Sequence, residues 1–247
     1  MIGVVLSHYP QYEEEAVDSI SQLDRVMVVR DFHSTVNYAE NVETYELSDN
    51  SLLSKFNFVF ENTNIGDWLL FLDGDDKILE LPKLQINENT AMIKSGKTMT
   101  SYNILSSKLA PTILQKHLDW HITGTLIKNK GISLYGEYSL DKQLMFNVLN
   151  WQNEIEWKPY KIYKRIHSQS RTSTQKLEIY KHTREIFQKA YNNSNNDAAQ
   201  KYAKYNILNN SILSGEKDKS ELLKTFFDGY RMPVYNYLLN FAKPSYK

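Results

Sequence analysis

Short apolar runs alternate with amphipathic segments along the first part of this chain. Buried strands are expected at the apolar runs, which lie at residues 2–6, 25–29 and 68–72, and a third strand is expected at residues 42–47. Between them, residues 12–23 and 52–60 carry apolar side chains at helical spacing, which predicts two helices. Ser48 and Asp49 can cap the second helix. Strands and helices in this alternation indicate an α/β fold with a largely parallel sheet.

The pattern changes further along the chain. Residues 77–117 give weak, mixed signals that allow no assignment, whereas residues 140–149 predict a helix. Further strands are expected at residues 121–127 and within 155–166. From residue 174 onward the periodicity is helical, at residues 175–191, 196–213 and 219–241. We therefore expect a catalytic domain over residues 1–173 and a helical region over residues 174–247, which covers that domain or forms a homodimer.

An acidic segment follows the apolar run at residues 68–72. Asp73, Asp75 and Asp76 place three carboxylates directly after an expected buried strand. Like charges this close repel each other and are costly to desolvate. A divalent cation removes both problems, and hard oxygen ligands suit Mg²⁺ or Mn²⁺ with phosphate oxygens completing the shell. The segment therefore indicates a metal–phosphate site, with a solvated acidic turn as the alternative.

Polar side chains also follow the first two expected strands. Ser7, His8 and Tyr9 come after the first strand, and Asp31 comes after the second. Ligands of open α/β sheets bind beyond the carboxyl ends of the strands. We therefore expect these side chains and the acidic segment to meet at one edge of the sheet.

Composition narrows the classes of function. The formal net charge of +0 provides no overall field that would recruit nucleic acid or an acidic membrane. The absence of cysteine excludes disulfides, thiolate catalysis and zinc–cysteine sites. The first residues enter an apolar strand without a basic leader, and no apolar run is long enough to span a bilayer. We expect a cytoplasmic protein, with peripheral contact at the inner face of the membrane left open.

The acidic segment also carries a resemblance to a known family. Residues 66–76 read GDWLLFLDGDD, and this segment resembles the core motif of the family 2 glycosyltransferases with the GT-A fold. Other segments resemble further elements of that family, namely Tyr9, Asp31 with Ser34, Lys55-Phe56-Asn57, Gly124–Lys128, Asp141 and Arg165–Ser170. Arg30 and Leu140 stand where acidic residues are usual. The resemblance covers residues 2–170 and implies a Rossmann-like mixed sheet with a C-terminal helical appendage.

The resemblance implies a metal-dependent, inverting hexosyltransferase that builds a bacterial surface polysaccharide or lipopolysaccharide. Its donor would be a nucleotide sugar, most commonly a UDP-sugar, and its acceptor a glycan or a lipid-linked sugar. By this resemblance, Mn²⁺ or Mg²⁺ would be bound by Asp75, Asp76 and His167. The donor would be bound by Tyr9, Asp31, Asn57, Asp73 and Arg165.

Inverting transfer needs a base that deprotonates the acceptor hydroxyl on the face opposite the leaving group. Asp141 is the candidate for this base, and Glu137 competes with it. Trp120 and His121 lie where the family often builds its acceptor site. Each site residue has a structural alternative: a strand-end cap for Asp31, core packing for Tyr9 and a helix N-terminal charge for Asp141.

Two other functions stay open at the level of the sequence. Nucleotidyl or phosphoryl transfer also uses acidic strand ends, although no glycine-rich phosphate loop of the G-x-x-x-x-G-K-[ST] type is present. A nucleotide-sugar-binding module without a catalytic base is the non-enzymatic alternative. The position of Asp141 relative to the acidic segment discriminates between a transferase and a binding module.

Overall fold

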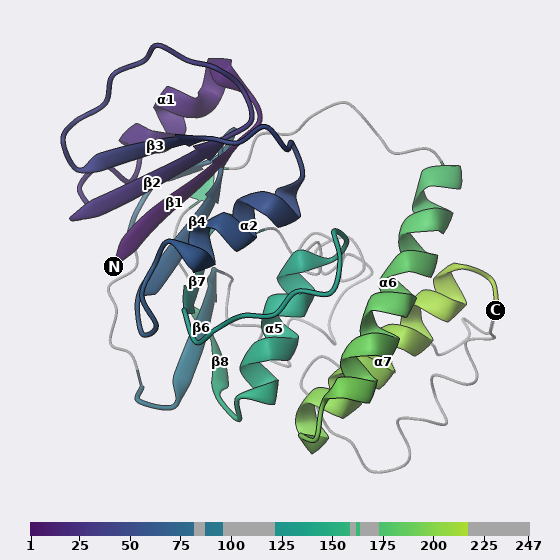
Figure 1. Ribbon diagram of the computed structural model, residues 1–247. Coiled ribbons are helices and arrows are strands. Elements are labelled where there is room, and N and C mark those ends of the chain that lie inside the picture. Colours follow the sequence, from purple (N-terminus) through teal and green to yellow (C-terminus); the bar gives the residue numbers. More distant parts are fainter. Residues whose placement is uncertain (82–86, 96–121, 159–161, 164–172, 217–247) are drawn as a thin grey trace, which may run out of the picture. The chain divides into compact units, whose positions relative to one another are not determined.

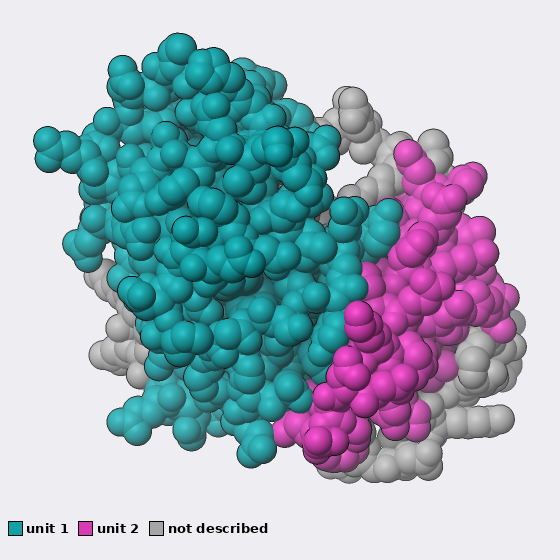
Figure 2. Space-filling model, in the orientation of Figure 1, with its two compact units in different colours: residues 1–97, 120–168 teal, residues 98–119, 169–247 magenta. Residues whose placement is uncertain are grey.

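A computed structural model describes residues 1–81, 87–95, 122–158, 162–163 and 173–216 (Figure 1). The chain divides into two compact units, coloured separately in Figure 2. The first unit comprises residues 1–97 and 120–168, and the second comprises residues 98–119 and 169–247. Each unit is described by itself.

A mixed sheet forms the centre of the first unit. Its strands are β1 (Ile2–Ser7), β2 (Arg25–Arg30), β3 (Val42–Glu46), β4 (Trp68–Asp73), β6 (Thr90–Ser95), β7 (Thr125–Lys128) and β8 (Glu154–Lys158), in the order β3-β2-β1-β4-β7-β6-β8. The first four are parallel, β7 runs antiparallel to both β4 and β6, and β8 runs parallel to β6. A separate antiparallel pair joins β5 (Lys77–Ile78) to β9 (Ile162–Tyr163).

The strand β4 is buried on both of its faces, which explains its unbroken apolar run. Leu70 and Leu72 belong to a core cluster that also contains Ala16 and Val17 of α1 (Pro10–Asp18). Phe71 points to the other face because successive side chains of a strand alternate. There its ring lies 4.8 Å from that of Phe56 on α2 (Leu52–Glu61). The helices α1 and α2 thus pack on opposite faces of the sheet.

Several expected boundaries need correction. The first helix ends at Asp18, and the two apolar positions beyond it, Ile20 and Leu23, are buried from a turn instead. The second helix is not capped by Ser48 or Asp49. Its cap is Ser51, whose Oγ accepts a hydrogen bond from the Ser54 N–H at 3.0 Å. Asp49 instead accepts from the Ser51 N–H at 2.8 Å, so it supports the cap from outside the helix.

The later strands are also shorter than expected. The strand expected at residues 121–127 is observed as β7, which begins only at Thr125, so Gly124 precedes the strand. The segment 155–166 contains most of β8 and all of β9 in place of a single strand. Between β7 and β8 lies α5 (Leu140–Asn150), which matches the helix expected at residues 140–149.

Arg30 anchors the loop that follows β2. It is buried, and its Nη1 donates to Glu13 Oε1 at 2.9 Å while its Nη2 donates to Glu46 Oε1 at 3.0 Å and to the Ser34 carbonyl at 3.1 Å. Tyr38 donates to the same Glu13 oxygen at 3.0 Å. Burial, followed by the negative charge of Glu13, raises the pKa of Tyr38, so this hydroxyl stays protonated and keeps donating.

We expect Arg30→Met to lower the free energy of unfolding by about 3–5 kcal/mol, because it leaves the Glu13 carboxylate buried without its counter-charge. The control is Arg25→Met at the start of the same strand. Arg25 pairs with Glu43 at 2.8 Å, but both side chains are partly exposed. An exposed pair of this kind contributes at most about 1 kcal/mol. Urea denaturation measures both variants, and equal losses would contradict the anchoring role of Arg30.

Two long helices form the described part of the second unit. They are α6 (Ser173–Asn193) and α7 (Asp197–Leu213), joined by a short turn. Their contact includes the rings of Phe187 and Tyr202, whose centroids lie 6.0 Å apart. Asn196 caps α7 by accepting from the Ala199 N–H at 3.0 Å. The helix expected at residues 219–241 lies outside the described residues, and none of the described helices is both long and apolar enough to cross a membrane.

Candidate functional site

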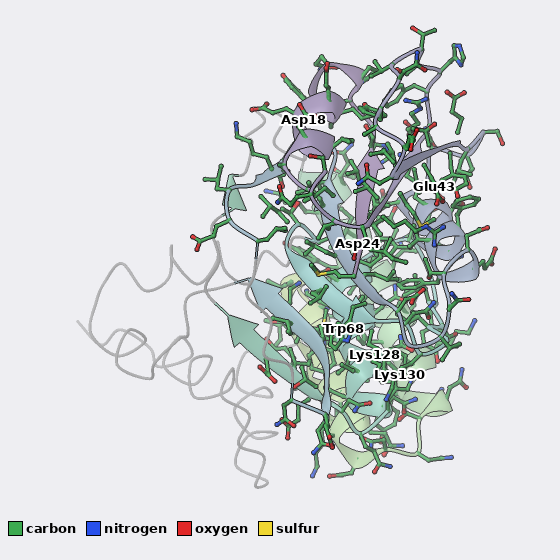
Figure 3. The ribbon with its side chains drawn as sticks, turned by 90° about the vertical axis from the view of Figure 1, so that its left-hand side faces the viewer. Asp18, Asp24, Glu43, Trp68, Lys128 and Lys130 are labelled. Carbon is green, nitrogen blue, oxygen red and sulfur yellow. The ribbon has the colours of Figure 1, made fainter. Side chains whose placement is uncertain are left out.

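The carboxyl ends of β1, β2 and β4 meet at one edge of the sheet. In the strand register Ser7 aligns with Arg30, and Leu6 aligns with Asp73. His8, Asp31 and the acidic turn follow these positions directly, so the structure brings them to the same edge, as expected from the sequence. The opposite edge is marked in Figure 3 by Asp24, Trp68 and Lys128.

Gly74 allows the acidic turn to fold back against β1. Its N–H donates to the Leu6 carbonyl at 2.9 Å, and a Cβ at this position would lie 2.7 Å from the Ser7 Cα. No side chain fits at that distance from a backbone atom. The turn is closed by the Asp76 N–H, which donates to the Asp73 carbonyl at 3.0 Å. Glycine is therefore required between the first two aspartates.

The turn gathers three carboxylates in one place. Asp73, Asp75 and Asp76 each offer one oxygen, and these oxygens all lie within 4.8 Å of one another. Asp73 and Asp75 are half-buried, whereas Asp76 is only 5% exposed. Clustered oxygen ligands of this kind fit the coordination preference of Mg²⁺ and Mn²⁺. The third predicted metal ligand, His167, lies outside the described residues, as does the predicted phosphate contact Arg165.

A buried lysine lies beside Asp31. Lys55, on α2, is fully buried, and its Nζ donates to the Ser7 carbonyl at 2.5 Å. Nζ also lies 3.2 Å from Asp31 Oδ2 and 2.9 Å from His8 Nδ1. The His8 Nδ1 itself lies 2.6 Å from the same Asp31 oxygen. One carboxylate oxygen therefore sits between two nitrogen groups.

This cluster keeps Asp31 ionised. Burial acts to raise the pKa of Asp31, but the hydrogen bonds from His8 and Lys55 outweigh it and hold the pKa below its ordinary value. Burial lowers the pKa of Lys55, and the negative charge of Asp31 counters that effect only in part. The Asp31 carboxylate is thus a fixed hydrogen-bond acceptor at the edge of the sheet.

The resemblance to the family assigned Asn57 to the donor site. The structure instead brings Lys55, from the same segment of α2, to the cluster. Asn57 is exposed, and it lies two positions from Lys55, so the two side chains leave α2 on different sides. The apolar stripe of α2 contained a signal for this. Lys55 falls between Leu52 and Val59 at helical spacing, on the buried face of the helix. A charged residue on an apolar stripe needs a buried partner.

Tyr9 and Glu137 are both accessible. Tyr9 immediately precedes α1, is 41% exposed and has its ring 6.3 Å from that of Tyr12. Core packing therefore does not account for Tyr9, and its predicted contact with a nucleobase stays a prediction. Glu137 is exposed in the loop before α5.

Asp141 lies in the first turn of α5, two residues after Ser139, whose φ of 56° is in the left-handed region. The Oδ2 oxygen of Asp141 is enclosed and has no hydrogen-bond partner among the residues that the structure describes. Burial raises the pKa of this carboxyl, and the positive charge of Lys94 opposes the shift only in part. Lys94 on β6 aligns with Thr125, which aligns with Phe71 near the carboxyl end of β4. The strand register therefore carries Lys94 toward the edge where the acidic turn lies.

The loop before Asp141 is held by two amide side chains that the sequence analysis did not single out. Gln143 accepts from the Tyr135 N–H at 2.6 Å and donates to the Tyr138 carbonyl at 2.9 Å. One helical turn later, Asn147 donates to the Ser133 carbonyl at 2.9 Å. Both amides are buried on the face of α5 that otherwise carries apolar side chains. Polar residues at helical spacing among buried positions are the signal that could have found them.

The chain was compared with known proteins in three ways. A scan against family models and a search of curated proteins each return no match. Among solved structures, the chain is similar to the mannosyltransferase PcManGT from Pyrobaculum calidifontis, which was solved in complex with GDP-Man and Mn²⁺. The match covers 98% of this chain and 79% of that chain, with 13% sequence identity and a TM-score of 0.58.

The chain has a glycosyltransferase fold. This likeness and the mixed sheet together confirm the predicted GT-A-like, Rossmann-like architecture. The likeness concerns the fold alone, so the activity has to be argued from the site itself.

Proposed function

We propose that this protein is a metal-dependent inverting glycosyltransferase of family 2 that uses a nucleotide sugar. The observation that carries the proposal is the acidic turn at the carboxyl edge of a glycosyltransferase fold, beside the ionised Asp31. The acceptor in this proposal is a glycan or a lipid-linked sugar of a bacterial surface polysaccharide or lipopolysaccharide. In this proposal the reaction takes place in the cytoplasm or at the inner face of the membrane. The protein acts as a monomer or as a homodimer.

Asp75 and Asp76 are the proposed metal ligands among the described residues, with His167 as a further ligand and Asp73 facing the ribose. The three clustered carboxylates fit Mn²⁺ or Mg²⁺, because their oxygens lie within 4.8 Å of one another. The metal, when bound, would neutralise charge on the departing nucleoside diphosphate. Arg165 is the proposed cation for the diphosphate, and Asn57 stays a proposed donor contact.

Asp31 is the proposed contact for the nucleobase. Its Oδ2 lies between Lys55 Nζ and His8 Nδ1, so the acceptor is flanked by nitrogen groups. The imide N–H of uracil, which thymine shares, can donate to this carboxylate. We therefore propose a UDP-sugar as the donor, with Tyr9 against the base.

Asp141 is the proposed catalytic base. An in-line displacement at the anomeric carbon needs one carboxylate that takes the proton of the acceptor hydroxyl. Asp141 has an enclosed oxygen that no described residue hydrogen-bonds and a pKa raised by burial, and both features suit a proton acceptor. Glu137 is exposed and its loop is held from α5 by Gln143, so it keeps second place.

We expect Asp31→Asn to weaken binding of UDP by about 10–100-fold, because a hydrogen bond to a charged group contributes about 1.5–3 kcal/mol. Isothermal titration calorimetry with UDP and Mn²⁺ measures the effect. Asp24→Asn is the matched control, because Asp24 is an exposed aspartate at the opposite edge of the sheet. A variant with unchanged affinity for UDP would contradict the placement of the base.

A donor panel tests the proposed function as a whole. The protein is incubated with Mn²⁺ and UDP-, GDP-, TDP- and CMP-sugars, and release of the nucleotide and the thermal shift are followed. Release of one nucleotide that stops on metal chelation supports the transferase. Binding without release, even with candidate acceptors present, favours the binding module, and transfer of phosphate or nucleotide in place of sugar favours the second enzyme class.

A further inference from the structure

A sharp turn places Thr123 over the end of β4. Gly124 adopts a φ of 73°, and its N–H donates to the Phe71 carbonyl at 2.8 Å. The Thr125 N–H closes the turn by donating to the Ile122 carbonyl at 2.8 Å. Since a left-handed φ favours glycine, Gly124 lets the chain enter β7 directly after Thr123.

The Thr123 hydroxyl joins the two ends of the acidic turn. Its Oγ1 accepts from the Asp73 N–H at 3.0 Å and donates to Asp76 Oδ2 at 2.6 Å. Thr123 is 2% exposed and Asp76 is 5% exposed, so both interactions lie away from bulk water. A short bond from a hydroxyl to a carboxylate is charge-assisted and therefore among the stronger hydrogen bonds. Its buried position strengthens it further, because the local dielectric is low.

The bond restricts the geometry of the carboxylate cluster. Thr123 holds the backbone of Asp73 with one side of its hydroxyl and the carboxylate of Asp76 with the other. Asp75 lies between these two fixed points along the turn. Three like charges within 4.8 Å would otherwise turn away from one another. A hydroxyl from the turn before β7 therefore opposes the spreading of the cluster before any metal is bound.

We propose that Thr123 is a positioning residue that preorganises the acidic turn for a divalent cation. This inference rests on the proposed function, because it takes the three aspartates as the metal site. Thr123 acts through Asp76 and the Asp73 backbone, without touching the metal itself. Groups that orient metal ligands from outside typically change metal affinity by about 10–100-fold when they are removed.

The chain offers a matched pair of substitutions. Thr123→Val keeps the shape of the side chain and removes the hydroxyl. Thr125→Val makes the same change two residues later, where the hydroxyl is equally buried but has no hydrogen-bond partner in the described part of the chain. Mn²⁺ alone is the probe, and the fall of its free-ion signal in electron paramagnetic resonance measures binding without any need for activity.

We expect Thr123→Val to weaken Mn²⁺ binding by about 10-fold or more. Thr125→Val is expected to bind Mn²⁺ like the wild-type protein, and Thr123→Ser, which keeps the hydroxyl, to bind within a few-fold of it. Circular dichroism establishes that each variant is folded. If Thr123→Val does not fold, Thr123→Ala and Thr123→Ser form the second pair, which still differs by a hydroxyl.

The outcomes separate this inference from the proposed function. If the wild-type protein binds Mn²⁺, Asp75→Ala does not, and both valine variants bind like the wild-type protein, the role of Thr123 is overturned while the metal site stands. If the wild-type protein and Asp75→Ala bind Mn²⁺ equally, or neither binds it, the metal site falls and the role of Thr123 falls with it. Weaker binding in Thr123→Val alone supports the inference.

Discussion

Asp75→Ala is expected to reduce sugar transfer by about 1,000-fold or more. A bound divalent cation contributes several kcal/mol of charge stabilisation in the transition state, and each 1.36 kcal/mol corresponds to a tenfold change in rate. Asp75 is one of the three carboxylates whose oxygens lie within 4.8 Å of one another. Release of nucleotide from the preferred donor measures the loss, and metal chelation should reproduce it in the wild-type protein.

The same substitution should not weaken the fold in the absence of metal. Removing one of three neighbouring carboxylates relieves repulsion, so the melting temperature of metal-free Asp75→Ala should equal or exceed that of the wild-type protein. The increase in melting temperature that Mn²⁺ causes should disappear. Asp24→Ala, at the opposite edge of the sheet, is the control for both measurements. An Asp75→Ala variant that transfers sugar at the wild-type rate would refute the proposed metal site.

The parallel part of the sheet could be predicted because its strands are marked twice in the sequence. Strands β1, β2 and β4 are apolar runs, and each ends in polar residues. In β4 both faces are buried, so Leu70, Phe71 and Leu72 are all apolar. This unbroken run predicts a buried strand. The common edge followed from the rule that parallel strands end together. The sequence therefore predicts the acidic turn at the edge where the structure has it.

The partners of the site were not predictable in the same way, because they come from distant segments. Thr123 reaches Asp76 across 47 positions of sequence, and Lys55 reaches the Ser7 carbonyl across 48. A lone threonine before a glycine carries no local signal of such a contact. Lys55 did carry one, since it interrupts an apolar stripe. Arg30 stood out in the sequence only as a departure from the family pattern, and its two carboxylate partners became visible in three dimensions.

Asp141→Asn is expected to lower kcat by about 100–10,000-fold, the range that general base catalysis typically contributes. Affinity for UDP and Mn²⁺ should stay unchanged, because the proposed donor contacts are Asp31 and the acidic turn. Glu137→Gln is the matched control, and it should keep most of the activity. Steady-state kinetics with the identified donor and acceptor measures kcat, and calorimetry measures the affinity. If Glu137→Gln loses activity and Asp141→Asn keeps it, the base is Glu137.

The raised pKa of Asp141 adds two expectations with a definite sign. A base must be deprotonated, so kcat/KM of the wild-type protein should fall as the pH drops through this raised pKa. The folded state also holds the proton more tightly than the unfolded chain does, so ionisation of Asp141 lowers stability as the pH rises from its unfolded pKa through its folded pKa. Asparagine resembles the neutral carboxyl group. Asp141→Asn should therefore melt no lower than the wild-type protein at neutral pH, and a variant that loses both activity and stability would favour a structural role for Asp141 instead.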